Sequence, residues 1–380
     1  MNTRVDVTLV GGGIAGAWLL NLLNTRGYRT VLIEAEGFGT HQTLASQGMI
    51  HGGLKYALSG NLTAASEAIA DMPARWRACL AGEDDVDLRN TRLAADRYYM
   101  FAKGTALGRL TGFFASKALR GRIDPVSKAD WPDAFRGFDG VLYQLNDFVV
   151  ETQTLLSNLT DAHRHRTIEH RLTAQEITAQ DEGFHITTPY AEFDTQWLVS
   201  CAGEGAAALI EGLDIDLKTQ VRPLKQVVVR PKHETALFAH CLTGIKGNEP
   251  RLTITTHRDA QGSLIYLGGA IATTGVNRSD AEQIEFAKAE LATCLPWLDW
   301  TGADFETFSI NRAEPYQKSG QRPDEAYVEA RGRFIQCFPT KLALAPDLGD
   351  KVAALLPPPS ASGQDLAPSQ RPVGLGNPPW

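Results

Sequence analysis

The sequence predicts a mixed α/β fold (α+β overall), in which a domain built on a parallel sheet is interrupted by a domain built on an antiparallel sheet. Three observations support this fold class. A glycine-rich turn joins a strand pattern to a helix pattern near residue 11, a second apolar strand pattern ends in a small-residue turn near residue 202, and three β-rich runs follow residue 220. The first two features are typical of parallel α/β units, and the third is typical of antiparallel hairpins.

The N-terminal unit has the order strand, turn, helix, strand. Residues 7–10 are apolar and β-branched at both ends, residues 14–23 place leucines along a helix, and residues 30–33 form a second apolar run. Gly27 ends the helix. This order predicts two neighbouring parallel strands joined by a helix.

The turn after the first strand carries the pattern G-x-G-x-x-G at Gly11, Gly13 and Gly16. The first glycine allows a tight turn, the second lets a pyrophosphate approach the backbone, and the third lets helix and strand pack closely. The free N–H groups at the helix start, at Ile14 and Ala15, would hold the phosphates at the positive end of the helix dipole. With both strands and the helix in register, the pattern predicts a dinucleotide site.

An acidic residue closes the second strand. Glu34, followed by Ala35, stands where a carboxylate accepts hydrogen bonds from a ribose 2′-hydroxyl. A 2′-phosphate would be repelled there, so NADP is disfavoured. These features fit either FAD or NAD.

Composition limits the possible partners. The chain has 380 residues, a formal net charge of -7 and a pI of about 5.8, which argues against general nucleic-acid binding. The five cysteines are dispersed and form no C-x-x-C pair, so they indicate a reducing compartment and no metal site. The cluster His163, His165 and His170 is interpreted as a solvated helix end. The aromatic and basic residues of 84–140 are interpreted as part of the substrate domain.

The chain enters its first strand almost at once, which leaves no room for a signal peptide and predicts a cytoplasmic protein. No apolar run approaches the ~18 residues that a membrane-spanning helix needs.

The remaining pattern predicts the element order. Helices are expected at 62–80, 152–163 and 281–295, the last capped by Ser279-Asp280, and strands are expected at 197–201 and near residues 184, 224, 251, 263, 306 and 333. The predicted domains are a first domain of 1–82, 145–220 and 326–356, a second domain of 83–144 and 221–325, and a disordered tail of 357–380. The tail is rich in Pro, Gly and Ser and offers little to bury.

The segment "THQTLASQGMIHGGLKYAL" (40–58) supplies a resemblance to a known family. It resembles the second cofactor loop of FAD enzymes of the D-amino-acid oxidase superfamily, and is most similar to FAD-dependent glycerol-3-phosphate dehydrogenases and L-2-hydroxyglutarate dehydrogenases. The resemblance implies a Rossmann-like FAD-binding domain with an inserted substrate domain. It places FAD against Thr43, Ser46, Gly48, Gly52 and Gly53.

Three later segments support the same resemblance. "VSCAGEGA" is similar to a strand end of the family and adds Ala202 and Gly203 to the cofactor site. "FPTKLALAP" resembles the loop that closes over the flavin ring, which assigns Thr340, Lys341 and Leu342 to the cofactor. Residues 338–340 replace the glycines expected there. "INRAEPY" stands where relatives place an arginine that faces the substrate.

The resemblance also implies the reacting groups. Lys341 is expected near the N1/O2 edge of the flavin, where negative charge develops on reduction, and Arg312 is expected to clamp a carboxylate or phosphate through its planar fork. Lys55 and Tyr56 match a substrate-facing pair, and His51 is a candidate base for a hydroxyl proton. Arg322 is a weaker second clamp.

These residues predict an FAD-dependent dehydrogenase or oxidase. It would take a hydride from a C–OH or C–NH carbon of a small anionic substrate such as glycerol 3-phosphate, a 2-hydroxy acid or an amino acid, and pass electrons to oxygen, a quinone or a protein. An NAD(P)H-dependent flavin monooxygenase, for which Gly349-Asp350 fits poorly, and a tRNA-modifying or non-catalytic flavoprotein are the alternatives. No nucleic acid or metal is expected. Peripheral membrane contact stays open, because some relatives dock to membranes.

Overall fold

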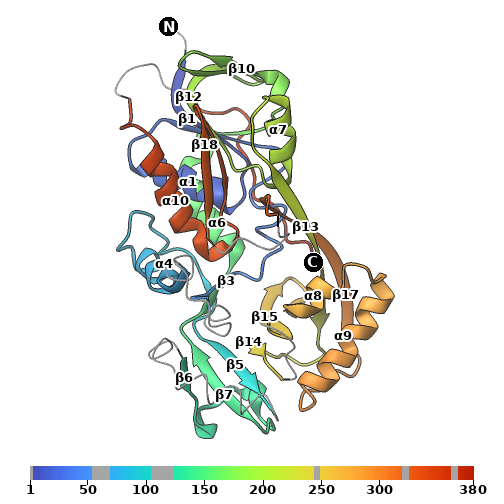
Figure 1. Ribbon diagram of the computed structural model, residues 1–380. Helices are drawn as coiled ribbons and strands as arrows, with labels where there is room; N and C mark the ends of the chain where they lie inside the picture. Colours follow the sequence, from blue (N-terminus) through green and yellow to red (C-terminus); the bar gives the residue numbers. More distant parts are fainter. Residues whose placement is uncertain (1–2, 54–68, 104–122, 244–248, 319–324, 361–366) are drawn as a thin grey trace.

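The protein is described here from a computed structural model. The described residues are 3–53, 69–103, 123–243, 249–318, 325–360 and 367–380. The chain forms two parts, each built around its own sheet, and the long strands β13 (Thr219–Arg230) and β17 (Asp304–Pro315) run from one part to the other (Figure 1).

The first part is built on a mostly parallel sheet. Strand β1 (Arg4–Val10) lies between β2 (Thr30–Glu34) and β12 (Glu192–Ser200), and all three run parallel. The end of β12 also pairs in parallel with β19 (Phe334–Phe338). The sheet is completed by β9 (Thr167–Glu169), β10 (Ile177–Gln180), β11 (Gly183–Thr187) and β18 (Tyr327–Arg331). The C-terminal ends of β1, β2, β12 and β19 therefore lie at the same end of the sheet, beside the glycine turn.

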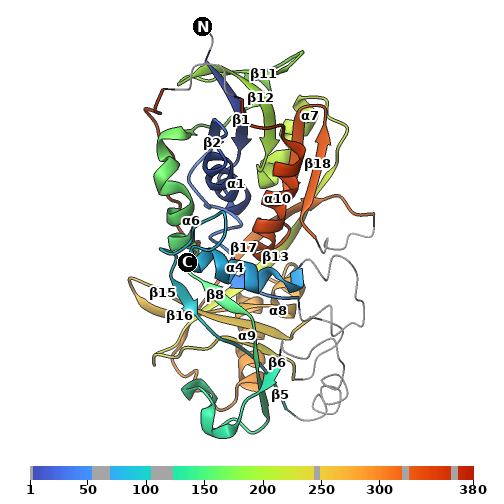
Figure 2. The ribbon, with the colours of Figure 1, turned by 90° about the vertical axis from the view of Figure 1, so that its left-hand side faces the viewer.

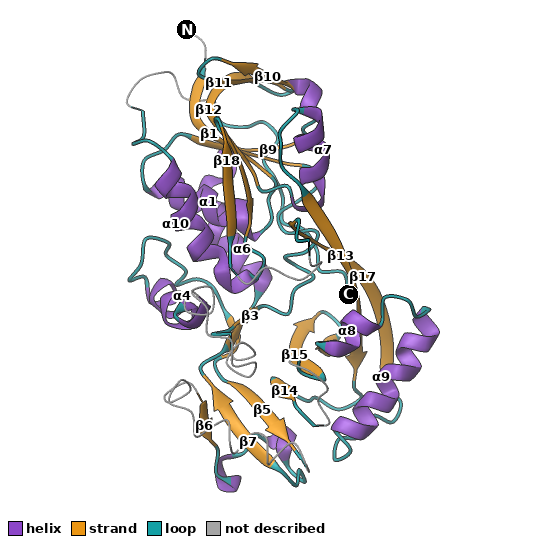
Figure 3. Ribbon diagram, in the orientation of Figure 1, coloured by secondary structure: helices purple, strands orange, loops and turns teal. Residues whose placement is uncertain are grey.

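Helices cover both faces of this sheet (Figure 3). One face carries α1 (Ile14–Thr25), α6 (Thr152–Thr160), continued by the 3-10 turn η4 (Asp161–Arg166), and α10 (Ala345–Leu355). The other face carries α7 (Ala206–Gly212), which follows the turn η6 (Gly203–Gly205). Because both faces are covered, β1 and β2 are buried along almost their whole length, including the polar residues Asp6, Thr8 and Thr30.

The second part is built on a larger, mainly antiparallel sheet. Its strand order is β17-β13-β16-β15-β14-β5-β7-β6, and only β14 and β5 run parallel. Its other strands are β5 (Tyr98–Ala102), β6 (Ile123–Pro125), β7 (Val141–Leu145), β14 (Ala239–Cys241), β15 (Leu252–Asp259) and β16 (Gly262–Gly268). Helices α8 (Ala270–Thr274) and α9 (Asp280–Cys294) cover one face.

A small sheet joins the two parts (Figure 2). It contains β3 (Met49–Ile50), β8 (Phe148–Val150) and β4 (Leu93–Ala95), and helix α4 (Met72–Ala81) packs beside it. Short 3-10 turns lie at Lys128–Asp130, Asp133–Phe135, Ala174–Glu176 and Leu342–Leu344, of which the last is η7. Of the helix predicted at 62–80, the described part is α4; residues 54–68 lie outside the described residues.

The C-terminal segment differs from the prediction of a disordered tail over 357–380. Residues 371–376 pack along the first part: the Arg371 carbonyl accepts a hydrogen bond from the Glu169 N–H (2.9 Å), and Val373 is 1% exposed. Leu375 forms a bridge with Phe38. The tail is poor in apolar residues, but it is held by backbone pairing along existing segments, which composition does not show.

Candidate active site

The glycine turn is built without room for larger side chains. Gly11 has φ +106°, donates its N–H to the Ile33 carbonyl (2.8 Å), and a Cβ on it would lie 2.5 Å from the Cys201 carbonyl oxygen. A Cβ on Gly16 would collide with the Gly11 carbonyl. The first and third glycines of the pattern therefore serve the close packing of β1, α1 and β12, as the motif predicts.

Glu34, which the sequence assigns to the ribose of the dinucleotide, lies beside this turn. Its carboxylate accepts hydrogen bonds from the N–H groups of Gly12 (2.5 Å) and Glu36 (2.9 Å), which fixes it at the end of β2 beside the glycine turn. A carboxylate has lone pairs beyond these two bonds, so the position suits a ribose diol. Ala35 follows at the surface of the same turn.

The second cofactor loop caps helix α1. The Thr43 hydroxyl accepts a hydrogen bond from the Ile14 N–H (2.9 Å), so this loop reaches the helix start where phosphates were predicted. Gly48 has φ +67°, and a Cβ there would collide with the Val150 carbonyl. Ser46 accepts a bond from the Gly48 N–H (3.3 Å). The loop is therefore bonded directly to the helix start, beside the glycine turn.

The loop between β19 and α10 contains Thr340 and Lys341. Lys341 is only 4% exposed, and Thr340 has φ +59°. The Lys341 N–H donates to the Pro339 carbonyl (2.6 Å), and the following turn η7, which begins at Leu342, lies against β3. The Trp76 Nε1–H fixes η7 by donating to the Ala343 carbonyl (2.9 Å). The structure therefore brings the Lys341 loop next to the segment that leads to His51.

His51 lies in a turn that is fixed by two hydrogen bonds from backbone N–H groups. Its Nδ1 accepts a hydrogen bond from the Gly53 N–H (3.2 Å), so a neutral ring carries its proton on Nε2. The neighbouring Gly52 N–H donates to Asp147 Oδ1 (3.0 Å). A role of His51 as a base through Nδ1 would require the Gly53 N–H to move away, and that role stays a prediction.

Asp147 is a residue that the sequence analysis missed. Burial raises its pKa to about 7, although the Gly52 N–H opposes the shift. The only sequence signal is the polar pair Asn146-Asp147 between two apolar strands, which resembles any hairpin turn. Its importance comes from the contact with residue 52, which no local pattern reveals.

Arg312 lies on β17, opposite Arg222 of β13. Arg222 is paired with the buried Glu314 (2.8 Å). Burial raises the pKa of Tyr266, and the Arg312 charge acts in the opposite direction. Tyr266 pairs with Val228, which pairs with Glu306 of β17, and Arg312 lies an even number of positions further along β17. Arg312 and Tyr266 therefore share the sheet face that α8 and α9 leave uncovered.

Side-chain hydrogen bonds connect the loop at 42–48 to this sheet face. Tyr266 donates its hydroxyl proton to the Ala45 carbonyl (2.6 Å), and Gln47 Nε2 donates to the carbonyls of Thr253 (3.0 Å) and Tyr266 (3.1 Å). Gln42 accepts from the Ala313 N–H (3.3 Å). The loop at 42–48 thus contacts both the glycine turn and the strand that carries Arg312.

Other predicted site residues have different positions. Gly203 has φ +54° at the start of η6, and a Cβ there would meet nothing within 4 Å, so backbone conformation explains this glycine better than close approach does. Ala202 lies beside Gly11. Lys55, Tyr56 and Arg322 lie outside the described residues.

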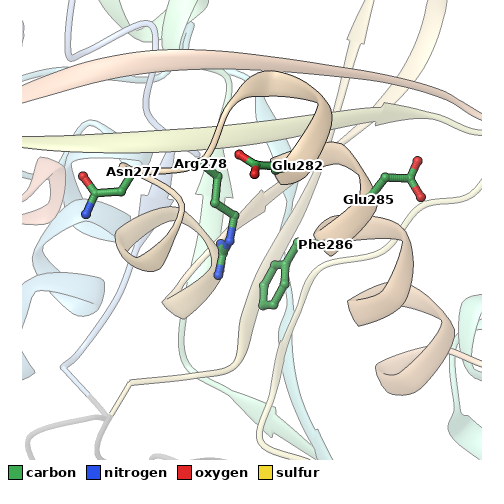
Figure 4. A pocket seen from close by; sticks show the side chains of 5 residues that line it. All are labelled: Asn277, Arg278, Glu282, Glu285 and Phe286. Atoms are coloured by element: carbon green, nitrogen blue, oxygen red, sulfur yellow. The ribbon is translucent and has the colours of Figure 1, made fainter.

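A surface hollow between α8 and α9 is lined by Asn277, Arg278, Glu282, Glu285 and Phe286 (Figure 4). The Arg278 guanidinium lies 3.8 Å from the Phe286 ring centroid and also bonds Gln283 Oε1 (2.9 Å). The hollow lies on the helix-covered side of the sheet and holds none of the predicted site residues.

Within the described ranges, no group of three or more His, Cys, Asp or Glu side chains is arranged to hold a metal ion. No helix in the described part of the chain has the length and apolar character needed to cross a bilayer.

The fold and site define a class: a two-part protein with a dinucleotide-binding parallel sheet and an antiparallel sheet facing its cofactor loop. A family model described as "FAD dependent oxidoreductase" matches residues 6–335. A probable FAD-dependent oxidoreductase of Pseudomonas aeruginosa is 44% identical over 360 residues, covering 92% of this chain and 90% of that protein. The chain belongs to this family of FAD-dependent oxidoreductases, and FAD is its cofactor.

Solved structures agree on the fold. The crystal structure of the P. aeruginosa protein has a TM-score of 0.84 at 36% identity, covering 100% of this chain and 98% of that one. Glycine oxidase from Geobacillus kaustophilus has a TM-score of 0.65 at 18% identity (95% and 97% covered). L-alpha-glycerophosphate oxidase from Mycoplasma pneumoniae, solved with FAD bound, has a TM-score of 0.66 at 14% identity (99% and 99% covered). The last two show the fold alone.

Proposed function

We propose that this protein oxidises a small anionic substrate at a C–OH or C–NH carbon, and that Arg312 binds the acid group of that substrate. The observation that carries this proposal is the position of Arg312 on β17, where the N–H of the next residue, Ala313, donates to Gln42 of the loop at 42–48. A guanidinium binds carboxylates and phosphates through two parallel N–H bonds. Glycine oxidase and glycerophosphate oxidase, which share the fold, are named for substrates that carry such groups.

FAD, when bound, accepts the hydride and later passes the electrons on. The residues of this chain supply orientation and charge. The glycine turn, Thr43 and Glu34 would hold the dinucleotide, and the buried Lys341 would favour negative charge at the flavin edge. Arg312 would fix the far end of the substrate, so that the reacting carbon is held in one orientation.

The direct test is anaerobic reduction of the purified holoenzyme, followed by flavin absorbance. The panel contains glycerol 3-phosphate, 2-hydroxyglutarate, lactate, several amino acids and NADH. Bleaching by a small anion without NADH would support the proposal and name the substrate class. Bleaching by NADH alone would favour the monooxygenase alternative and overturn the proposal.

Substitution of the clamp gives a sharper prediction. Arg312→Lys keeps the charge but loses the planar fork, and a charge-assisted hydrogen bond contributes about 1.5–3 kcal/mol, so KM is expected to rise about 10- to 100-fold. The matched control is Arg258→Ala, which removes an exposed arginine of the same sheet that pairs with Glu234. Equal KM values for Arg312→Lys and the unchanged protein would exclude Arg312 as the clamp.

A further inference from the structure

The C-terminal segment connects the cofactor half of the molecule to the substrate-domain sheet. The Phe38 N–H donates to the Gly374 carbonyl (2.8 Å), and the Gly376 N–H donates to the Phe38 carbonyl (3.0 Å). Phe38 follows Glu34 in the turn that faces the ribose side of the dinucleotide site. From there the chain runs to the end at residue 380, which lies between the two parts beside β13 and β17 (Figure 1).

Trp380 ends this segment inside an aromatic cluster. Its ring centroid lies 5.3 Å from that of Tyr266, 5.4 Å from that of His257 and 5.9 Å from that of Phe308. We call these four side chains the aromatic cluster. At such distances the rings are in contact, so another planar group has no room between Trp380 and Tyr266. Burial also lowers the pKa of His257 to about 4, so this ring is neutral at pH 7 and the cluster adds no cation of its own.

The aromatic cluster lies on the same sheet face as Arg312. Arg312 lies four positions after Phe308 on β17, and alternate residues of a strand point to one face. Tyr266 is in contact with the Phe308 ring and lies within the electrostatic reach of Arg312. The indole of Trp380 therefore covers part of the sheet face that carries the proposed anion clamp, against the rings of Tyr266 and Phe308.

We infer that Trp380 is a specificity-determining residue: it covers the sheet face along which a substrate held by Arg312 would extend, and so restricts the substrate to acids with a short body. This inference rests on the proposed function, because Arg312 must hold the acid group for Trp380 to limit what is attached to it. A bulky group on such an acid would have to displace the indole from Tyr266 and Phe308. Removal of the indole exposes their ring faces to the ligand instead.

The experiment uses unreactive carboxylates, so that it does not depend on turnover. Acetate, benzoate and indole-3-acetate are titrated into the holoenzyme, and Kd is obtained from the perturbation of the flavin absorbance. The variants are Trp380→Ala and Trp380→Phe. The matched control is Trp300→Ala, which removes a half-buried indole that packs on the opposite face of the sheet. The affinity for FAD is measured for each variant.

For Trp380→Ala we expect the Kd of benzoate and indole-3-acetate to fall at least about tenfold, or 1.4 kcal/mol, with acetate unchanged. Trp380→Phe should lie between that variant and the unchanged protein, and Trp300→Ala should show no selective effect. If the carboxylates bind but Trp380→Ala does not alter the size preference, the inference is wrong and the proposed clamp stands. If no protein binds any carboxylate, the clamp and the inference both fail.

Discussion

Thr340 has a backbone conformation that is unfavourable for a β-branched residue. A left-handed φ of +59° favours glycine, and the family pattern has glycine near this position, but the chain has a threonine. Its hydroxyl donates to the Glu325 carbonyl (3.0 Å), which gives the strained residue a compensating bond. The substitution of the family glycines therefore leaves the turn before Lys341 intact.

Asp147 gives a pH prediction at the same scale. Its folded pKa of about 7 is above the ~3.9 of an unfolded aspartate, so the unfolded chain gives up this proton more easily than the folded one. The contribution of Asp147 to stability is thus complete below pH ~4 and is lost as the pH rises toward 7.

Asp147→Asn keeps an acceptor for the Gly52 N–H and removes the titration. We expect the unfolding temperature of the variant, relative to the unchanged protein, to rise from pH 5 to about pH 7 and to level off above it, in thermal unfolding monitored by fluorescence. Asp133→Asn, at an exposed aspartate, is the control and should give a constant difference. A constant difference for Asp147→Asn as well would show that Asp147 is not buried as a neutral acid.

At the scale of elements, helix α9 packs on one face of the antiparallel sheet of the second part. Its N-cap Ser279 accepts from the Glu282 N–H, and the Glu282 carboxylate accepts from the Ser279 N–H (2.8 Å). Ser279→Ala removes this cap and is expected to lower the free energy of unfolding by about 1 kcal/mol in urea titrations. Ser279→Asp retains an acceptor and should be close to neutral. A loss of equal size in both variants would contradict the capping role.

Elements with strong local signals could be predicted from the sequence. The glycine turn, α1, β2 and the capped helix α9 each carry their own pattern, and the structure confirms them within a few residues. Docking of the tail could not be predicted, because it depends on backbone pairing with Phe38 and the 167–169 strand. Asp147 and the pairing of Glu314 with Arg222 were missed for the same reason: both depend on contacts between distant segments.

At the scale of the whole molecule, bound FAD should stabilise both parts, since the loop 42–48 contacts the glycine turn and the second sheet. A ligand at one hundred times its Kd contributes about 2.7 kcal/mol. We therefore expect added FAD to raise the unfolding temperature of the apoprotein in a concentration-dependent manner.

Gly11→Ala should abolish this rise, because its Cβ would press on the Cys201 carbonyl. The matched control is Gly332→Ala, since Gly332 also has a positive φ (+58°) but a Cβ there would meet nothing within 4 Å. A full response to FAD in Gly11→Ala would show that the glycine turn does not form the dinucleotide site.

The position of β1 between β2 and β12 also has a consequence for synthesis on the ribosome. A nascent chain that has emerged only to residue 190 contains the glycine turn and β2 but lacks β12, and with it Cys201, the residue after β12 that packs against the turn. Its β1 then has an unpaired edge. Because β19 joins the same sheet still later, cofactor loading is expected to follow translation rather than accompany it, and the emerging N-terminal segment needs protection from aggregation until then.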